Sequence, residues 1–473
     1  MRTGNFWSRL DACASMRPPK SGLLPAVARN VVPAPCDDET ERGIRSNMAI
    51  DSRDELSFAL TQAASVEHSL ACQYLFAAYS LKRGTSDGLN YHQANLAGNW
   101  QRYLLMVARQ EMEHLGLVCN LLAAIGAAPY LGHPNFPYPT PMFSHIMQLE
   151  RFSEAALKRF ICFERPDEIS PTDAYCGEDL PPGDDTGPVS PVPIPYGSVG
   201  ELYRVIQDGF EKLAATIPLF IGPPGAQLTG METSTDFPRP GALGGAWDVF
   251  IVPVTDLPSA IAAIDEIRAQ GEGRDEVGGD LTHYRTFIRI LTELRQLKAE
   301  DPKFDPAHMV VSNPVLHKPT HSGQTQITNE LSAAVLDLSD AAYETMLLML
   351  IRVLAHTDES AAEIAELHAL MYGPMMTMIV RPLAEILVSL PAFADTQPER
   401  AGPSFQTYSM VQFLPHRQAA WKVLGERLQE LADRCLSVSK MPGMKPRLAY
   451  VAESLRLISE RFQADILQWS AQS

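Results

Sequence analysis

The stretch Ala108-Arg109-Gln110-Glu111-Met112-Glu113-His114-Leu115-Gly116 decides the fold of this chain of 473 residues. It lies inside a helix that the apolar periodicity predicts over residues 100–125, with one stripe formed by Leu104, Val107, Glu111, His114, Val118, Leu121 and Ile125. A carboxylate on an otherwise apolar face is costly unless it is paired, so Glu111-x-x-His114 suits a metal ion inside a helix bundle. For an isolated Glu-x-x-His, a simple Glu–His hydrogen bond is the alternative, because such pairs are common on ordinary helices.

Two further helices carry a single acidic residue in the same manner. The helix predicted over residues 54–81 has an apolar stripe that only Glu67 interrupts. The helix predicted over residues 198–214 has Glu201 in its first turn, but Ser198-x-x-Glu201 is also the pattern of a capping box. Taken alone, Glu67 is expected to be a partly exposed residue, but beside the next helix it becomes a second inward carboxylate. Glu201 stays open between a metal ligand and a helix cap.

The fourth part of the pattern lies between residues 258 and 294. A helix predicted over residues 258–270 ends in Gly271-Glu272-Gly273, and another begins at Asp280-Leu281-Thr282-His283. The apolar stripe of that second helix includes His283, and Asp280 completes an Asp-x-x-His pattern. Further helices are predicted over residues 331–355, 361–390, 418–438 and 448–469, the second of them kinked at Gly373-Pro374.

Taken together, these positions form the pattern of a carboxylate-bridged two-metal bundle: a Glu, a Glu-x-x-His, another Glu, and a carboxylate with a His. Carboxylate oxygens bridge and neutralise two ions, while imidazoles leave coordination positions open for oxygen or substrate. Ligands of this hardness suit two iron ions, with manganese as the alternative.

At these residues the chain resembles one family. The resemblance rests on Glu67-His68, Gln73, Arg109–Leu115, Asn120, Asn135-Phe136-Pro137, Gly200–Tyr203, Gly271–Gly273, His283-Tyr284, Ala401–Phe405 and Leu414-Pro415. They are similar to the ferritin-like domain of iminophenyl-pyruvate dimer synthases, the bisindole-pathway enzymes of violacein and rebeccamycin type. The match runs from about residue 51 to the end and lacks the long N-terminal portion of those enzymes.

The resemblance implies an all-α fold: a ferritin-like four-helix bundle with a helical C-terminal extension and long Pro/Gly-rich loops. It also implies a non-haem, di-iron oxidoreductase of specialised metabolism that acts on a small organic substrate. It favours Glu272 over Asp280 as the carboxylate partner of His283. The expected metal ligands are Glu67, Glu111, His114, Glu201, Glu272 and His283, with Glu113 and Tyr203 as neighbours. A metal-binding protein without turnover, for storage or sensing, and a purely structural protein are the alternatives.

The charge and composition of the chain exclude several classes of binding partner and location. A net charge of −17 argues against nucleic acid and against an anionic membrane surface. The chain has no run of about 20 apolar residues that could span a membrane. Its seven cysteines form no Cys-x-x-Cys pair and suggest no disulfide framework, which favours a reducing, cytoplasmic location. A small-molecule substrate is expected, with a homodimer or a pathway enzyme as the protein partner.

Three regions are predicted. Residues 1–47 lack apolar periodicity and are expected to be a disordered tail, with an organelle transit peptide or an over-long gene model as alternatives. Residues 48–300 are expected to form the metal-binding bundle, and residues 301–473 a helical extension packed on it.

Overall fold

The computed structural model describes residues 49–139, 146–176, 198–223, 225–229, 251–272, 281–355, 358–395, 397–408 and 414–472. The chain divides into Met1–Asn47 and Met48–Ser473, and the second of these forms one compact unit. Residues 1–47, the predicted tail, lie outside the described residues. The boundary expected near residue 300 stays a prediction.

Helices dominate the described residues, which confirms the all-α prediction. The elements are α3 (Arg53–Ser80), η1 (Thr85–Asp87), α4 (Tyr91–Ala124), α5 (Glu154–Phe163), η2 (Thr172–Ala174), α6 (Val199–Ala214), α7 (Leu257–Glu272), α8 (His283–Glu300), α9 (Glu330–Ala355), α10 (Ala361–Leu370), η3 (Met371–Val380), α11 (Arg381–Leu387), α12 (Arg417–Ser439) and α13 (Arg447–Gln472). A short parallel pair, β1 (Pro314–Val315) and β2 (Thr325–Gln326), accompanies them.

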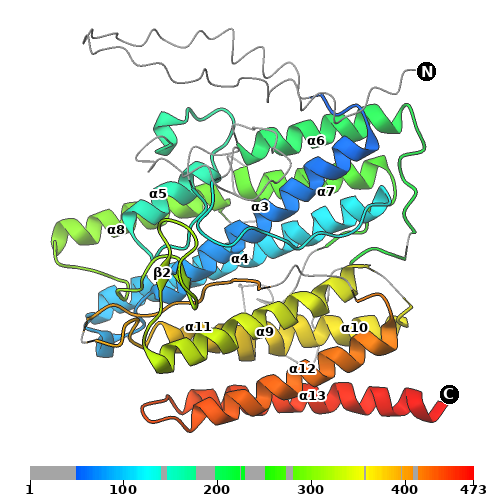
Figure 1. Ribbon diagram of the computed structural model, residues 1–473. Helices are drawn as coiled ribbons and strands as arrows, with labels where there is room; N and C mark the ends of the chain where they lie inside the picture. Colours follow the sequence, from blue (N-terminus) through cyan, green and yellow to red (C-terminus); the bar gives the residue numbers. More distant parts are fainter. Residues whose placement is uncertain are drawn as a thin grey trace, which may run out of the picture. The chain divides into compact units, whose positions relative to one another are not determined.

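The long helices α3 and α4 pack along each other and form the centre of the bundle (Figure 1). Helix α3 begins where the Ser52 side chain accepts a hydrogen bond from the Glu55 backbone N–H. Helix α4 begins at Tyr91, nine residues before the predicted start at residue 100. A capping box between Asn90 and Gln93 starts it there, ahead of the first regular apolar spacing.

Two pairs of short helices complete the bundle. Helices α6 and α7 pack on each other and on α3 and α4, and α5 packs on α8 (Figure 1). Helix α5 ends at Phe163, α6 begins at Val199, α7 ends at Glu272 and α8 begins at His283. Glu164, which follows α5, and His283, which begins α8, lie close together, and His283 contacts Glu111 of α4.

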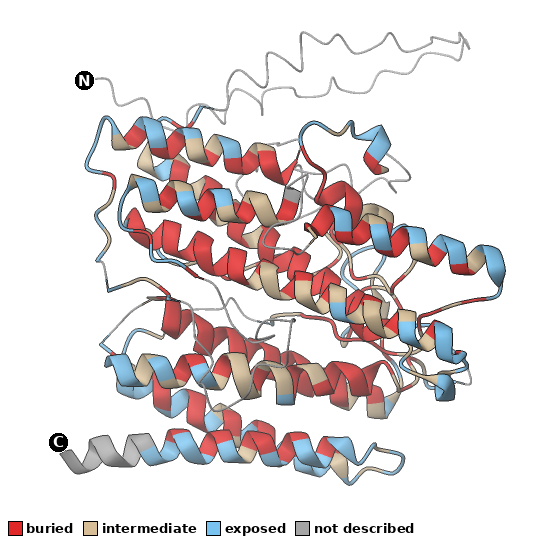
Figure 2. Cartoon of the chain, turned by 180° about the vertical axis from the view of Figure 1, so that it is seen from behind, coloured by how far each residue is buried: buried red, intermediate tan, exposed pale blue. Residues whose placement is uncertain are grey.

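The C-terminal helices form a second layer. Helix α9 packs on α4, α11 and α12, and α12 pairs along its length with α13. The region around Gly373-Pro374, predicted to kink, is the π-helical segment η3, which joins α10 to α11. Figure 2 shows buried residues running through the central helices, whereas the helix that ends at the C-terminus keeps an exposed face.

One expectation about cysteine is wrong. Cys162, near the end of α5, and Cys176, just after η2, form a disulfide. The chain turns back after α5, so that the two Cα atoms lie 5.3 Å apart, which no spacing motif in the sequence signals. Cys72, Cys119 and Cys435 are buried free thiols. Among the described helices, none has the length and apolar character needed to cross a membrane.

Candidate metal centre

The middle of the bundle brings together three carboxylates and two imidazoles. They form two overlapping groups with metal-ligand spacing: Glu67, Glu111 and His114 in one, and Glu111, Glu164 and His283 in the other. The side chains come from α3, α4, the residue that follows α5, and the first turn of α8. All five residues are at most 3% exposed, so their charges are removed from solvent.

Glu111 is shared between the two groups. Its Oε2 lies 3.3 Å from Nδ1 of His114, and its Oε1 lies 2.9 Å from Nδ1 of His283. The other neighbour of His114 Nδ1 is Glu67 Oε2 at 3.5 Å. Glu164 Oε2 lies at the same distance, 3.5 Å, from Nδ1 of His283. The Nδ1 atom of each imidazole thus faces two carboxylates, and the Glu111 carboxylate lies beside both histidines.

Two glutamines fix the orientation of the imidazoles. Nε2 of His114 lies 3.1 Å from Oε1 of Gln270, and Nε2 of His283 lies 3.1 Å from Oε1 of Gln110. An amide oxygen only accepts, so each Nε2 donates, and each Nδ1 of a neutral ring presents its lone pair to the carboxylates. Such outer hydrogen bonds are typical of histidines that ligate metals.

The five residues fit a pair of cations. Oε1 of Glu111 and Nδ1 of His283 are buried and close, yet neither has a well-aligned hydrogen-bond partner. Lone pairs that face carboxylate oxygens repel them unless a positive charge lies between. Three oxygen and two nitrogen ligand groups are a donor set that suits iron or manganese.

The pKa values show how strongly the centre attracts positive charge. Burial, with added repulsion from Glu111, raises the pKa of Glu67 to about 7. Burial alone would lower the pKa of His283, but Glu111 and Glu164 outweigh it and raise that pKa to about 9. Burial also opposes the charged form of His114, but Glu111 and Glu67 outweigh it and raise the pKa of His114 well above its ordinary value. Protons therefore collect where metal ions would bind, and metal binding would release them.

Two tyrosines donate hydrogen bonds to the carboxylates of Glu67 and Glu164, each of which belongs to one group only. The Tyr203 hydroxyl donates to Oε1 of Glu67, and the Tyr74 hydroxyl donates to Oε1 of Glu164 at 2.5 Å. Tyr203 and Arg268 also line a cavity of about 10 Å³ beside the ligands, roughly the space of one water molecule. Tyr203, predicted as a neighbour of the centre, contacts it directly.

Glu201 does not join either group of ligands among the described residues. The Ser198 side chain accepts a hydrogen bond from the Glu201 backbone N–H at 3.0 Å, as expected of a helix cap. The Glu201 side chain lies 3.8 Å from Arg204 and stays 17% exposed. On α6 the residue that reaches the centre is Tyr203, two positions later. Glu113, the other predicted neighbour, lies near Arg109, 3.6 Å away.

The choice between Glu272 and Asp280 stays open. Glu272 is the last residue of α7, and the position of its side chain is not described. Asp280 lies outside the described residues. We still expect Glu272→Ala to lose one metal equivalent and Asp280→Ala to keep both, because the resemblance favours Glu272 and Asp280 suits a cap.

Sequence reasoning missed Glu164. It follows the last residue of α5, in Phe163-Glu164-Arg165-Pro166, and has no helical stripe to mark it. One signal was present: a carboxylate at the C-terminal end of a helix is disfavoured by the helix dipole, so it needs a positive partner. Here its Oε2 faces His283.

Glu164→Ala is expected to lose one metal equivalent, whereas Glu201→Ala keeps both. Even the loss of an outer hydrogen bond costs metal affinity ~10–100-fold, so the loss of a direct ligand costs at least that. Elemental analysis of both purified variants after iron loading measures the difference. The assignment of Glu164 would be wrong if the Glu201 variant were the one that loses metal.

Part of the chain matches a known family, and the whole is similar to two curated proteins. Residues 60–292 match the ferritin-like family model. The chain is 27% identical to dichlorochromopyrrolate synthase from Lentzea aerocolonigenes over 89% of its own length and 42% of that protein. It is also 27% identical to 2-imino-3-(indol-3-yl)propanoate dimerase from Chromobacterium violaceum, over 65% of its own length and 29% of that protein.

The chain thus spans less than half the length of these curated relatives. A solved ferritin-like protein from Caulobacter vibrioides overlaps 69% of this chain and 96% of its own, with a TM-score of 0.42 and 18% identity. The family match covers every ligand of the two groups, from Glu67 to His283. Residues 60–292 are a ferritin-like domain, in a chain similar to dichlorochromopyrrolate synthase and 2-imino-3-(indol-3-yl)propanoate dimerase.

Proposed function

We propose that this protein is a non-haem, di-iron oxidoreductase that acts on a small organic substrate in specialised metabolism. The observation that carries the proposal is the double role of Glu111, whose two oxygens face two different histidines. A carboxylate placed in this way could contribute to both positions of a metal pair. Iron bound there would supply the redox chemistry needed to activate oxygen or peroxide.

The residues of the chain supply the rest of the site. Glu67, Glu111 and His114 would hold one ion, and Glu111, Glu164 and His283 the other. Tyr203 and Tyr74 keep the outer carboxylates oriented through their hydrogen bonds. Burial excludes bulk water from the ligands, which limits exchange of the metals and unwanted side reactions.

The substrate class is proposed from the relatives. One of them is named as a dimerase of 2-imino-3-(indol-3-yl)propanoate, and the other as a synthase of dichlorochromopyrrolate. We infer an aromatic imino acid, or a product of its coupling, as the substrate here. A pathway enzyme that delivers such a reactive imine is the expected partner, and a homodimer is the alternative assembly.

Oxygen uptake by the iron-loaded protein tests this function. The full chain would be reconstituted anaerobically with ferrous iron and mixed with freshly generated 2-imino-3-(indol-3-yl)propanoate. Oxygen consumption that depends on substrate, with a new product by mass spectrometry, is expected, and Glu111→Gln should lack both.

Two results would overturn the proposal. Iron that binds and oxidises while aromatic imines stay unchanged would favour storage or sensing. A protein without any transition metal after reconstitution would favour a purely structural role.

A further inference from the structure

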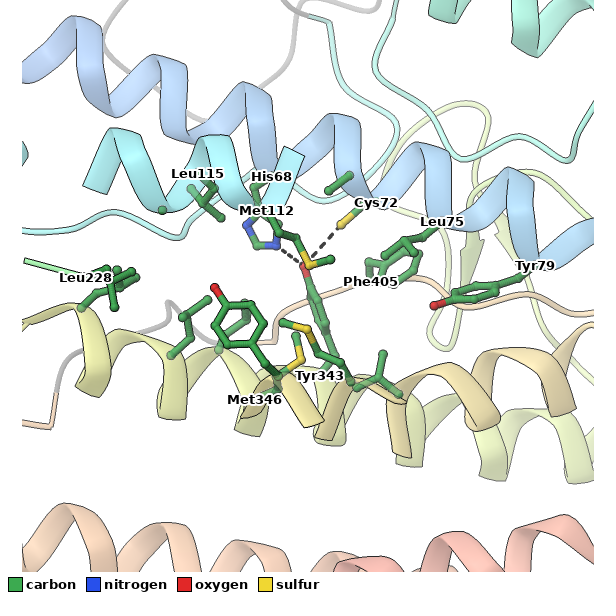
Figure 3. A pocket seen from close by; sticks show the side chains of 18 residues that line it. His68, Cys72, Leu75, Tyr79, Met112, Leu115, Leu228, Tyr343, Met346 and Phe405 are labelled. Carbon is green, nitrogen blue, oxygen red and sulfur yellow. Dashed lines mark hydrogen bonds between the residues drawn. The ribbon is translucent and has the colours of Figure 1, made fainter. Parts of the chain in front are cut away.

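A second cluster of buried ligand side chains lies on the other side of α3. His68 and Cys72, one turn apart on α3, and His133, from the segment after α4, come within metal-ligand distance of one another. His68 and Cys72 contact the hydroxyl of Tyr343, which reaches them from α9 (Figure 3). His133 contacts the same hydroxyl. Each of the four residues is at most 9% exposed.

Backbone carbonyls fix the protons of both imidazoles. Nδ1 of His68 lies 2.9 Å from the carbonyl oxygen of Leu131, and Nδ1 of His133 lies 2.8 Å from that of Pro134. A carbonyl oxygen only accepts, so each Nδ1 carries the hydrogen of a neutral ring. Each Nε2 is therefore a lone pair. Both lone pairs face the Tyr343 hydroxyl, at 2.6 Å from His68 and 3.1 Å from His133.

This arrangement cannot be satisfied by hydrogen bonds among the four residues. The Tyr343 hydroxyl has one hydrogen and can donate it to only one of the two lone pairs. The Cys72 sulfur lies 3.4 Å from the hydroxyl oxygen and can donate only to that oxygen. Among these four residues, one buried imidazole nitrogen is left without a donor, which costs stability unless a cation binds between the two imidazoles and the cysteine sulfur.

We propose that Nε2 of His68, Nε2 of His133 and the sulfur of Cys72 bind a single copper or zinc ion. Two imidazoles and a thiolate are the ligands that these metals prefer over iron or manganese. Carbonyl-fixed rings are typical of histidines that ligate metals. Cys72 binds as the thiolate, so one proton leaves to solvent for each ion bound.

The surroundings favour copper over zinc. The cluster opens onto a cavity of about 90 Å³ with an almost entirely apolar lining. Met112 from α4 and Met346 from α9 line this cavity beside Cys72 and Tyr343 (Figure 3). Thioether sulfur is a soft ligand that selects Cu(I), and an apolar lining excludes water from the ion.

This site is chemically distinct from the carboxylate centre. Glu67 and His68 are neighbours on α3, but successive helical side chains point about 100° apart. The two groups of the carboxylate centre contain no cysteine, whereas the second cluster contains no carboxylate. A thiolate-to-metal charge-transfer band therefore distinguishes the second cluster from the carboxylate centre.

Metal titration of the full chain tests the proposal. Metal-free protein would be titrated separately with Co²⁺, as a coloured substitute for zinc, and with copper under anaerobic conditions. A thiolate charge-transfer band that saturates at one equivalent is expected with Co²⁺. Chelator competition then gives the affinities for Cu(I) and zinc, and the inferred preference predicts tighter Cu(I) binding.

Cysteine variants supply the matched comparison. Cys72→Ser should lose the band and weaken zinc and copper binding more than ~10–100-fold, the cost of losing even an outer interaction. Cys119→Ser replaces another buried free thiol, on α4, and should keep both the charge-transfer band and the metal affinity. Far-UV circular dichroism of the two variants checks that both are folded. His133→Asn, which leaves α3 intact, should repeat the effect of Cys72→Ser on affinity.

Tyr343→Phe separates a metal site from a plain hydrogen-bond network. Removing the hydroxyl leaves the three ligands in place, so the Cys72-dependent band should persist. The proposal is overturned if the wild-type protein shows no band, if Cys72→Ser keeps it, or if the band requires the Tyr343 hydroxyl instead of the cysteine.

Discussion

Glu111→Gln is expected to abolish loading of both metal positions, the largest effect of any single substitution in the carboxylate centre. Glu111 contributes Oε2 beside His114 and Oε1 beside His283, so both groups lose a charged oxygen at once. Glutamine keeps the size of the side chain but removes its negative charge. The loss of a hydrogen bond to a metal ligand already lowers metal affinity ~10–100-fold. Each metal position should therefore lose at least that much affinity when the ligand itself loses its charge.

Glu113→Gln is the matched control. Glu113 is on the same helix, is only 2% exposed, and lies 3.6 Å from Arg109, outside both groups of ligands. Iron per chain, measured after anaerobic loading and dialysis, should fall from as many as two to none in the Glu111 variant and stay unchanged in the control. Retention of one full equivalent by Glu111→Gln would show that the two positions do not share this carboxylate.

Arg352→Ala should produce the largest loss of stability away from the metal centre. Arg352 on α9 pairs with Glu359, with Nε of the arginine 2.8 Å from Oε1 of the glutamate, and both side chains are 0% exposed. The same Oε1 accepts a hydrogen bond from the Trp421 indole on α12 at 3.3 Å. Removing the arginine leaves a buried carboxylate without its counter-charge, which typically costs about 3–5 kcal/mol.

Urea unfolding followed by circular dichroism measures this loss. Arg456→Ala is the control, because Arg456 pairs with Glu453 and Glu460 on the exposed face of α13, where ion pairs contribute little. Replacing the buried pair together, as Arg352→Met with Glu359→Leu, should recover part of the stability, since both buried charges of the pair are removed. Equal losses from Arg352→Ala and Arg456→Ala would contradict this account.

Periodicity made the helical part of the centre predictable. Glu67, Glu111, His114 and His283 each interrupt an otherwise apolar stripe, and each faces the core as the spacing implies. The same reasoning located most helix ends to within a few residues. It failed at the start of α4, where Asn90 and Gln93 cap a first turn that lacks regular apolar spacing.

Residues outside the stripes could not be found in this way. Glu164 follows the last residue of α5, and His133 lies in an irregular segment, so neither follows a helical period. Their positions depend on how the chain returns to α3 and α4, which is a long-range property of the fold. Glu201 shows a different difficulty. The pattern Ser198-x-x-Glu201 is typical of a helix cap but also fits a metal ligand, and the sequence alone does not distinguish the two.

The position of α3 between the two clusters has a consequence for the engineering of this protein. Glu67 belongs to one cluster and His68 to the other, and both are attached to the same stiff helix. A substitution that turns or shifts α3 to improve one set of ligands moves the other set with it. Substitutions in the two clusters are therefore expected to be non-additive, and neither set can be redesigned independently of its neighbour.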